Sequence, residues 1–194
     1  MLSGQDSSAY LRRPRCNESL LLVIDVQERL VPVIEASEDL VERHCVLLQG
    51  LKALEVKTVF SEQYPKGLGS TVTALWPWVE EGDRNCFAKT SFSFVDAHPE
   101  LITAWKEDGI NHIILTGMET HICVYQTARD LLALGFMVTV VSDCVGSRWK
   151  EDSDMILSLM RHKGVRVMPT ETLLFDLLAE AGTTQFKQIS QLIK

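Results

Sequence analysis

Asp25, Lys89 and Cys123 are the side chains of this 194-residue sequence whose types and positions fit a catalytic role. Asp25 ends the apolar run 20–24, and Cys123 lies just past the apolar run 113–117, at the start of the next predicted helix. Lys89 lies among apolar and small residues, whereas an exposed lysine usually has polar neighbours. A thiol, a carboxylate base and a lysine that keeps the base ionised are the groups that nucleophilic catalysis needs.

The position of Cys123 carries an electrostatic expectation. Free N–H groups and the positive end of the helix dipole favour an anion at a helix N-terminus, so we expect the pKa of this thiol to be lowered. Each of the three residues also has an ordinary structural explanation: a packing cysteine, an aspartate that caps a turn, and a lysine whose stem lies on apolar residues. From the residues alone, both explanations stay open.

Short apolar runs alternate with helical patterns along the chain. The runs predict strands over 20–25, 57–61, 112–117, 137–141 and 165–168. Helical periodicity predicts helices over 39–54, 97–107, 121–134, 150–163 and 171–180. The stretch 64–88 breaks this rhythm, and we expect a short helix and a short edge strand there.

Strands that are apolar throughout and separated by helices are typical of a parallel sheet covered on both faces. The predicted fold class is therefore α/β: a three-layer α/β/α sandwich with a mainly parallel, doubly wound, Rossmann-like sheet of about six strands in the order 3-2-1-4-5-6. Ligands bind such sheets outside the carboxyl ends of the strands, where the strand order reverses. We expect Asp25 and Cys123 to share that crevice.

The composition, 46% hydrophobic and 23% charged, is that of a globular domain. We expect a flexible N-terminal arm over 1–17 and a single domain over 18–194. The net charge of −7 argues against nucleic-acid binding. No apolar stretch reaches the ~18 residues that cross a bilayer, and the start lacks a secretory signal, so we expect no membrane segment and a cytoplasmic location. The cysteines and histidines form no CxxC, HxH or HExxH pattern, so neither a disulfide framework nor a zinc site is expected.

Three ordered motifs resemble the isochorismatase-like hydrolase superfamily, which includes nicotinamidases and N-carbamoylsarcosine amidases. They are Asp25-Val26-Gln27, Lys89-Thr90 and Thr116-Gly117-Met118-Glu119-Thr120-His121-Ile122-Cys123-Val124. The resemblance implies that Asp25 is the general base, Lys89 its cationic partner and Cys123 a nucleophile that forms a thioester. It further implies an oxyanion hole made by the backbone N–H groups of Glu119 and Cys123, a cis peptide bond between Met118 and Glu119, and a homo-oligomer, a dimer or larger.

Two departures within that superfamily refine the expectation. Isochorismatases proper cleave a vinyl ether and generally lack the cysteine, so Cys123 indicates acyl chemistry. The stretch 61–69 lacks the Asp-x-His and further histidines with which nicotinamidases bind a metal, so the resemblance implies a metal-independent enzyme without a cofactor. Further residues expected to bind the substrate are Gln27, Tyr64, Phe92 and Met118.

The sequence therefore predicts a cysteine hydrolase that cleaves a C–N (amide-type) or related acyl bond of a small-molecule substrate. Three alternatives remain. The first is vinyl-ether hydrolysis of the isochorismatase kind, and the second is an interaction protein that retains the fold without turnover. The third is a redox-sensing role for Cys123, which a low thiol pKa would favour.

Overall fold

A six-stranded sheet in the order β3-β2-β1-β4-β5-β6 forms the centre of the protein. The computed structural model describes residues 12–80, 82 and 84–194. The strands are β1 (Ser19–Ile24), β2 (Lys57–Gln63), β3 (Cys86–Lys89), β4 (His112–Met118), β5 (Met137–Gly146) and β6 (Arg166–Met168). Every neighbouring pair runs parallel. The predicted fold class, sheet type and strand order are therefore confirmed.

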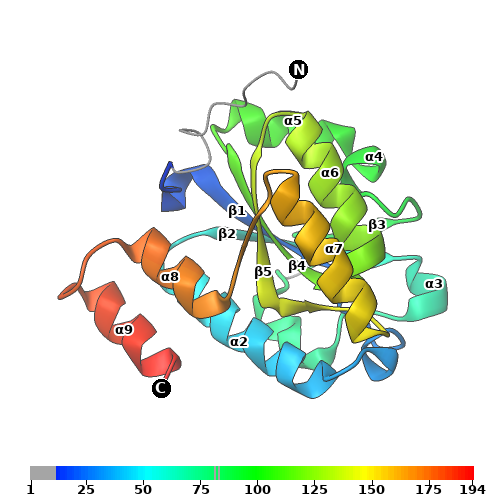
Figure 1. Ribbon diagram of the computed structural model, residues 1–194, viewed down its shortest axis with the longest axis horizontal. Coiled ribbons are helices and arrows are strands. Elements are labelled where there is room, and N and C mark those ends of the chain that lie inside the picture. The colour runs from blue at the N-terminus through cyan, green and yellow to red at the C-terminus, as the bar shows by residue number, and fades with distance from the viewer. Residues whose placement is uncertain (1–11, 81, 83) are drawn as a thin grey trace.

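Helices cover both faces of the sheet. One face carries α4 (Phe94–Ala97), α5 (Pro99–Glu107), α6 (Tyr125–Ala133) and α7 (Lys150–His162), and the other carries α2 (Ser37–Ala53), α8 (Thr170–Leu178) and α9 (Thr184–Leu192). Figure 1 shows α6 and α7 side by side on one side of the sheet and α2, α8 and α9 on the other. The connections contain η1 (Cys16–Glu18), η2 (Val31–Val33), α3 (Pro65–Leu68), η3 (Thr73–Trp78) and the π-helical turn η5 (Thr120–Val124). Across the described residues, no helix is long and apolar enough to span a membrane.

The strand β1 is buried on both faces, which explains its uninterrupted apolar sequence. Leu20, Leu22 and Ile24 pack in the core on the side of α5 to α7. Leu21 and Val23 pack on the side of α2 and α8. Successive side chains of a strand point to opposite faces, so a strand covered on both faces needs apolar residues at every position.

Two predicted helices are divided in the structure. The predicted helix 97–107 is α4 followed by α5, and His98 between them has φ −136° and ψ 57°. A residue that precedes a proline is disfavoured in the helical region, and His98 precedes Pro99. The predicted helix 121–134 begins as the π-helical turn η5 and continues as α6.

Two further elements extend beyond the prediction. The strand β5 continues to Gly146, and its register against β4 shifts between Leu115 and Gly117. The C-terminal helix α9 was not predicted, and it packs Ile189, which is fully buried, against the α2 side of the core.

Only part of the predicted N-terminal arm falls within the structure. Residues 1–11 lie outside the described residues. Residues 12–17 are described. Among them, Arg12 donates to the carboxylate of Glu18 at 2.8 Å, and the Cys16 thiol donates to the carbonyl of Leu177 in α8 at 3.7 Å. The flexibility of the arm and the domain boundary at residue 18 stay predictions.

Candidate active site

The carboxyl ends of β1, β2, β3 and β4 bring the predicted site residues together. Asp25 follows β1, Lys89 ends β3, and Cys123 lies in η5 after β4. Because β4 returns to the other side of β1, this is the point where the strand order reverses. Gly117 in β4 has φ 110°, and a Cβ there would lie 1.8 Å from the carbonyl oxygen of Ile24. Only glycine therefore allows β4 to approach β1 this closely beside Asp25.

Asp25 and Lys89 form a fully buried ion pair. The Nζ–Oδ2 distance is 2.7 Å, and both side chains are 0% exposed. The other carboxylate oxygen, Oδ1, accepts a hydrogen bond from the Ser61 hydroxyl at 2.6 Å. Asp25 also has φ 54°, a left-handed conformation that is uncommon for a non-glycine residue and that clusters at functional sites. The carboxylate is therefore fixed at both oxygens.

The buried ammonium of Lys89 has further oxygen partners. It donates to Gln63 Oε1 at 2.7 Å and to the carbonyls of Phe92 at 3.2 Å and Ser91 at 3.4 Å. The Gln63 amide is oriented by its own Nε2, which donates to the carbonyl of Thr90 at 2.7 Å. Each ammonium proton thus has an acceptor, as a buried charge requires.

Gln27 holds the end of β2 in place. Its Oε1 accepts from the Gln63 backbone N–H at 2.7 Å, and its Nε2 donates to the carbonyls of Gln63 at 3.1 Å and Gly69 at 2.6 Å. The residue is 0% exposed. We expected Gln27 to bind substrate, but this geometry favours a role in supporting Gln63.

Cys123 is 6% exposed, and burial is the largest cause that raises the pKa of its thiol to about 12. The negative charge of Asp25 and a hydrogen bond to Asp25 also raise this pKa, whereas Lys89 lowers it. The prediction that a helix N-terminus would lower the thiol pKa is therefore wrong, because desolvation and the negative charge of Asp25 penalise the thiolate more than Lys89 favours it. The structure nevertheless places Cys123 close enough to Asp25 and Lys89 for both side chains to shift the pKa of its thiol.

The connection from β4 to η5 is held by the loop that leads to α7. The peptide bond between Met118 and Glu119 is cis, as the resemblance implied. The Glu119 carboxylate accepts from the backbone N–H and from the Nε of Arg148, both at 3.0 Å. His121 shares a hydrogen bond with the Ser147 hydroxyl at 2.9 Å. These contacts fix the backbone on either side of the predicted oxyanion donors.

The other residues expected to bind substrate lie in different surroundings. Tyr64 and Phe92 are 55% and 51% exposed, and a pocket of about 560 Å³ beside Lys89 is lined in part by Tyr64. The Tyr64 ring lies over Gly67, where a Cβ would be 2.5 Å from a ring carbon. Met118 is fully buried in the core on the α2 side, whereas Cys123 packs on the opposite side. This position favours packing for Met118.

Ser61 and Gln63 are site residues that were not predicted from the sequence. Both lie on β2, next to β1 in the sheet, and they hold Asp25 and Lys89. The signal was present: polar residues follow the apolar Val59-Phe60 at the carboxyl end of a predicted strand.

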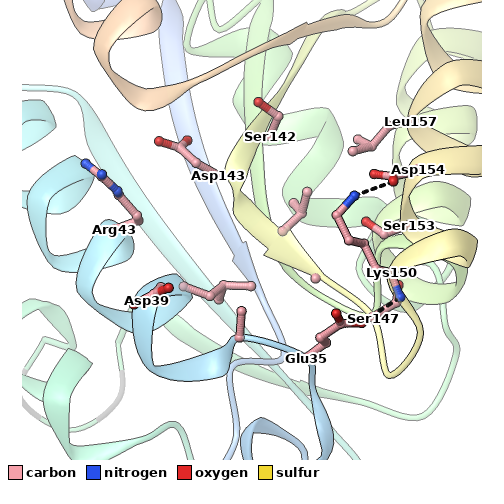
Figure 2. A pocket seen from close by; sticks show the side chains of 14 residues that line it. Glu35, Asp39, Arg43, Ser142, Asp143, Ser147, Lys150, Ser153, Asp154 and Leu157 are labelled. Atoms are coloured by element: carbon pink, nitrogen blue, oxygen red, sulfur yellow. Dashed lines mark hydrogen bonds and ion pairs between the residues drawn. The ribbon is translucent and has the colours of Figure 1, made fainter.

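A second pocket, of about 290 Å³, opens between α2 and α7 at the end of β5. Figure 2 shows charged side chains on both of its walls, with Arg43 and Asp39 on α2 and Lys150 and Asp154 on α7. Lys150 forms an ion pair with Asp154, and its backbone N–H donates to Glu35 at 3.0 Å. None of Asp25, Lys89 and Cys123 lines this pocket. Among the described residues, no group of histidine, cysteine and carboxylate side chains is arranged to hold a metal ion.

The parallel α/β fold and the site at its strand ends define a class of protein, and comparison with known proteins identifies that class. Residues 19–172 match the isochorismatase domain. The chain is 39% identical over 177 residues to isochorismatase domain-containing protein 1 of Danio rerio, covering 91% of this chain and 61% of that protein. It is 40% identical over 171 residues to the protein of the same name from Salmo salar, covering 88% of this chain and 59% of that protein. The chain thus spans about three-fifths of these two relatives.

A solved structure, described as the MAR1 ribonuclease from Caenorhabditis elegans, superposes with a TM-score of 0.85 at 32% identity. The superposition covers 94% of this chain and 92% of that one. The chain belongs to the isochorismatase family.

Proposed function

We propose that the protein is a cysteine hydrolase that cleaves a C–N or related acyl bond of a small molecule through a thioester on Cys123. The observation that supports this proposal most strongly is the buried Asp25–Lys89 ion pair, whose two charges both act on the pKa of the Cys123 thiol. A buried ion pair is weak support for stability. Placed beside a thiol at the end of a parallel sheet, it is a base with a fixed orientation.

In the proposed reaction, Asp25 accepts the proton of Cys123 as the sulfur attacks the carbonyl carbon of the substrate. The high thiol pKa means that deprotonation accompanies attack instead of preceding it. The carbonyl oxygen becomes an oxyanion that accepts hydrogen bonds from the backbone N–H groups of Glu119 and Cys123. The C–N bond then breaks, and the leaving amine takes the proton from Asp25.

The second half of the reaction releases the acid. Water attacks the thioester carbonyl while Asp25 accepts a proton from it. The C–S bond breaks, and the sulfur regains the proton from Asp25. Lys89 stays protonated throughout, orients the Asp25 carboxylate and favours its ionised form between proton transfers, while Ser61 and Gln63 act as positioning residues for Asp25 and Lys89.

The net charge of −7 favours a small molecule over RNA as the substrate. A similar structure is described as a ribonuclease. An enzyme that grips a polyanion needs a basic surface. Cleavage of RNA by this protein, lost on mutation of Cys123, would replace the small-molecule proposal.

The proposal is tested by screening hydrolysis of amides, ureas and thioesters or activated esters with the native protein and with two cysteine variants. Cys123→Ala removes the proposed nucleophile. Cys45→Ala is the matched control, because Cys45 is only partly buried and packs away from the site. We expect hydrolysis by the native protein and Cys45→Ala and none by Cys123→Ala. Equal turnover by all three proteins contradicts the mechanism.

A further inference from the structure

The outward face of α7 carries exposed apolar side chains. Met155 is 70% exposed and Leu159 is 36% exposed, and their spacing of four places them on one face of the helix. The opposite face packs Ser153, Leu157 and Met160 into the protein. Trp149, which precedes the helix, is 66% exposed. Large apolar side chains gathered in this way mark an interaction surface.

Charges of opposite sign lie at the two ends of this face. Glu151 and Asp152 lie in the first turn of α7. His162 ends the helix and Lys163 follows it, and both are exposed. Within the described residues, no ion pair engages Glu151 or Lys163, whereas Lys150 and Asp154 are paired with each other beside the pocket between α2 and α7 (Figure 2). The outward face is therefore acidic at its start, apolar at its centre and basic at its end.

We propose that α7 docks on α7 of a second copy of this chain in an antiparallel arrangement about a two-fold axis that passes between Met155 and Leu159. In that arrangement the acidic start of each helix faces the basic end of the other, and Met155 and Leu159 meet at the centre. A two-fold interface buries the same patch on both subunits, so the patch must complement itself. The charge order along α7 meets this requirement.

Tyr64 and Phe92, two other exposed aromatic side chains, are less suited to this interface. Tyr64 lines the pocket beside Lys89, and the Phe92 carbonyl accepts from the Lys89 ammonium. A subunit placed there would cover the approach to the site. The face of α7 is free of this conflict, yet it is tied to the site by Ser153, which hydrogen-bonds Thr120 of η5 at 3.0 Å. The inference concerns assembly and does not depend on the proposed hydrolysis.

Sedimentation velocity over a micromolar concentration series tests the apolar centre of the interface. We expect the native protein to be a dimer or a larger assembly built from dimers. Met155→Asp should raise the dimer dissociation constant at least about tenfold, because a charge at the centre of an interface is left without a partner. Leu134→Asp, which changes a 43% exposed residue at the end of α6, is the matched control and should assemble normally. A native monomer, or equal assembly by both variants, overturns the proposal.

Charge reversal tests the antiparallel arrangement without touching the apolar centre. In the proposed arrangement position 151 of one subunit faces position 163 of the other, so Glu151→Lys or Lys163→Glu alone places like charges opposite each other, and each variant should dissociate more readily at low ionic strength. Mixed in equal amounts, the two variants should form heterodimers, because the introduced lysine of one then meets the introduced glutamate of the other. Glu42→Lys, an exposed charge reversal on α2, is the control and should assemble as the native protein does. Failure of the mixture to assemble better than either variant alone overturns the arrangement.

Discussion

Removing Lys89 is expected to leave a buried, unpaired carboxylate. The native Asp25 side chain is 0% exposed and pairs with Lys89 at 2.7 Å, and the Ser61 hydroxyl donates to its other carboxylate oxygen at 2.6 Å. Breaking a buried pair by removing one partner costs about 3–5 kcal/mol, because the desolvated charge loses its compensation. We therefore expect Lys89→Met to lower the free energy of unfolding by about that amount, which leaves a domain of ordinary stability folded.

A double-mutant cycle separates this penalty from lost packing. Asp25→Leu together with Lys89→Met removes both charges, and we expect the double variant to be less destabilised than the sum of the two single variants by at least about 1–3 kcal/mol. Urea unfolding followed by circular dichroism measures each free energy. Matched Leu134→Met, at an exposed position, should change stability little. Additive losses would refute the conclusion that the two charges stabilise each other.

Three other predictions follow from the site and the core. Asp25→Asn, Lys89→Met and Cys123→Ala should each remove nearly all hydrolysis, and combining them should cost little more, because the three act as a unit; additive losses in kcat/KM would argue against this. Stability should fall as pH falls, because burial lowers the pKa of His44 to about 4 and of His112 to about 3. As the pH falls, the unfolded chain binds these protons before the folded protein does. The loss of stability therefore begins below the ordinary histidine pKa and for His44 reaches about 3 kcal/mol by pH 4. His44→Leu should flatten the dependence of the urea-derived free energy of unfolding on pH, and an unchanged slope would contradict the assignment. Hydrolysis should survive dialysis against EDTA, because the proposed steps use only the thiol, the carboxylate and backbone N–H groups; activity that disappears and returns with added zinc would show a metal requirement.

The fold was predictable because the central strands are covered on both faces. In β1 every position from Ser19 to Ile24 is buried, and the sequence shows this burial as an apolar run. Placing Asp25 near Cys123 needed only the rule that ligand sites follow the carboxyl ends of strands. Helix α9 was missed although Phe186, Ile189 and Leu192 recur in it at helical spacing, and Ile189 is its one buried residue.

The details of the site depend on contacts between distant residues, which the local sequence does not contain. Gln63 meets Lys89 because β2 pairs with β3 in a register that places these two residues opposite each other. The thiol pKa was predicted with the wrong sign because the sequence indicated a helix N-terminus but not the depth at which Cys123 is buried. Desolvation of the thiolate is the largest effect on this pKa.

The measurement that tests the central claim most directly is the location of a covalent intermediate. The protein would be mixed rapidly with a substrate found in the hydrolysis screen, quenched in acid, and analysed by intact mass and peptide mapping. We predict a mass increase equal to the acyl group, located on Cys123 and absent from Cys123→Ala. Turnover with no adduct on Cys123 at any quench time, together with undiminished activity of Cys123→Ala, would contradict the account.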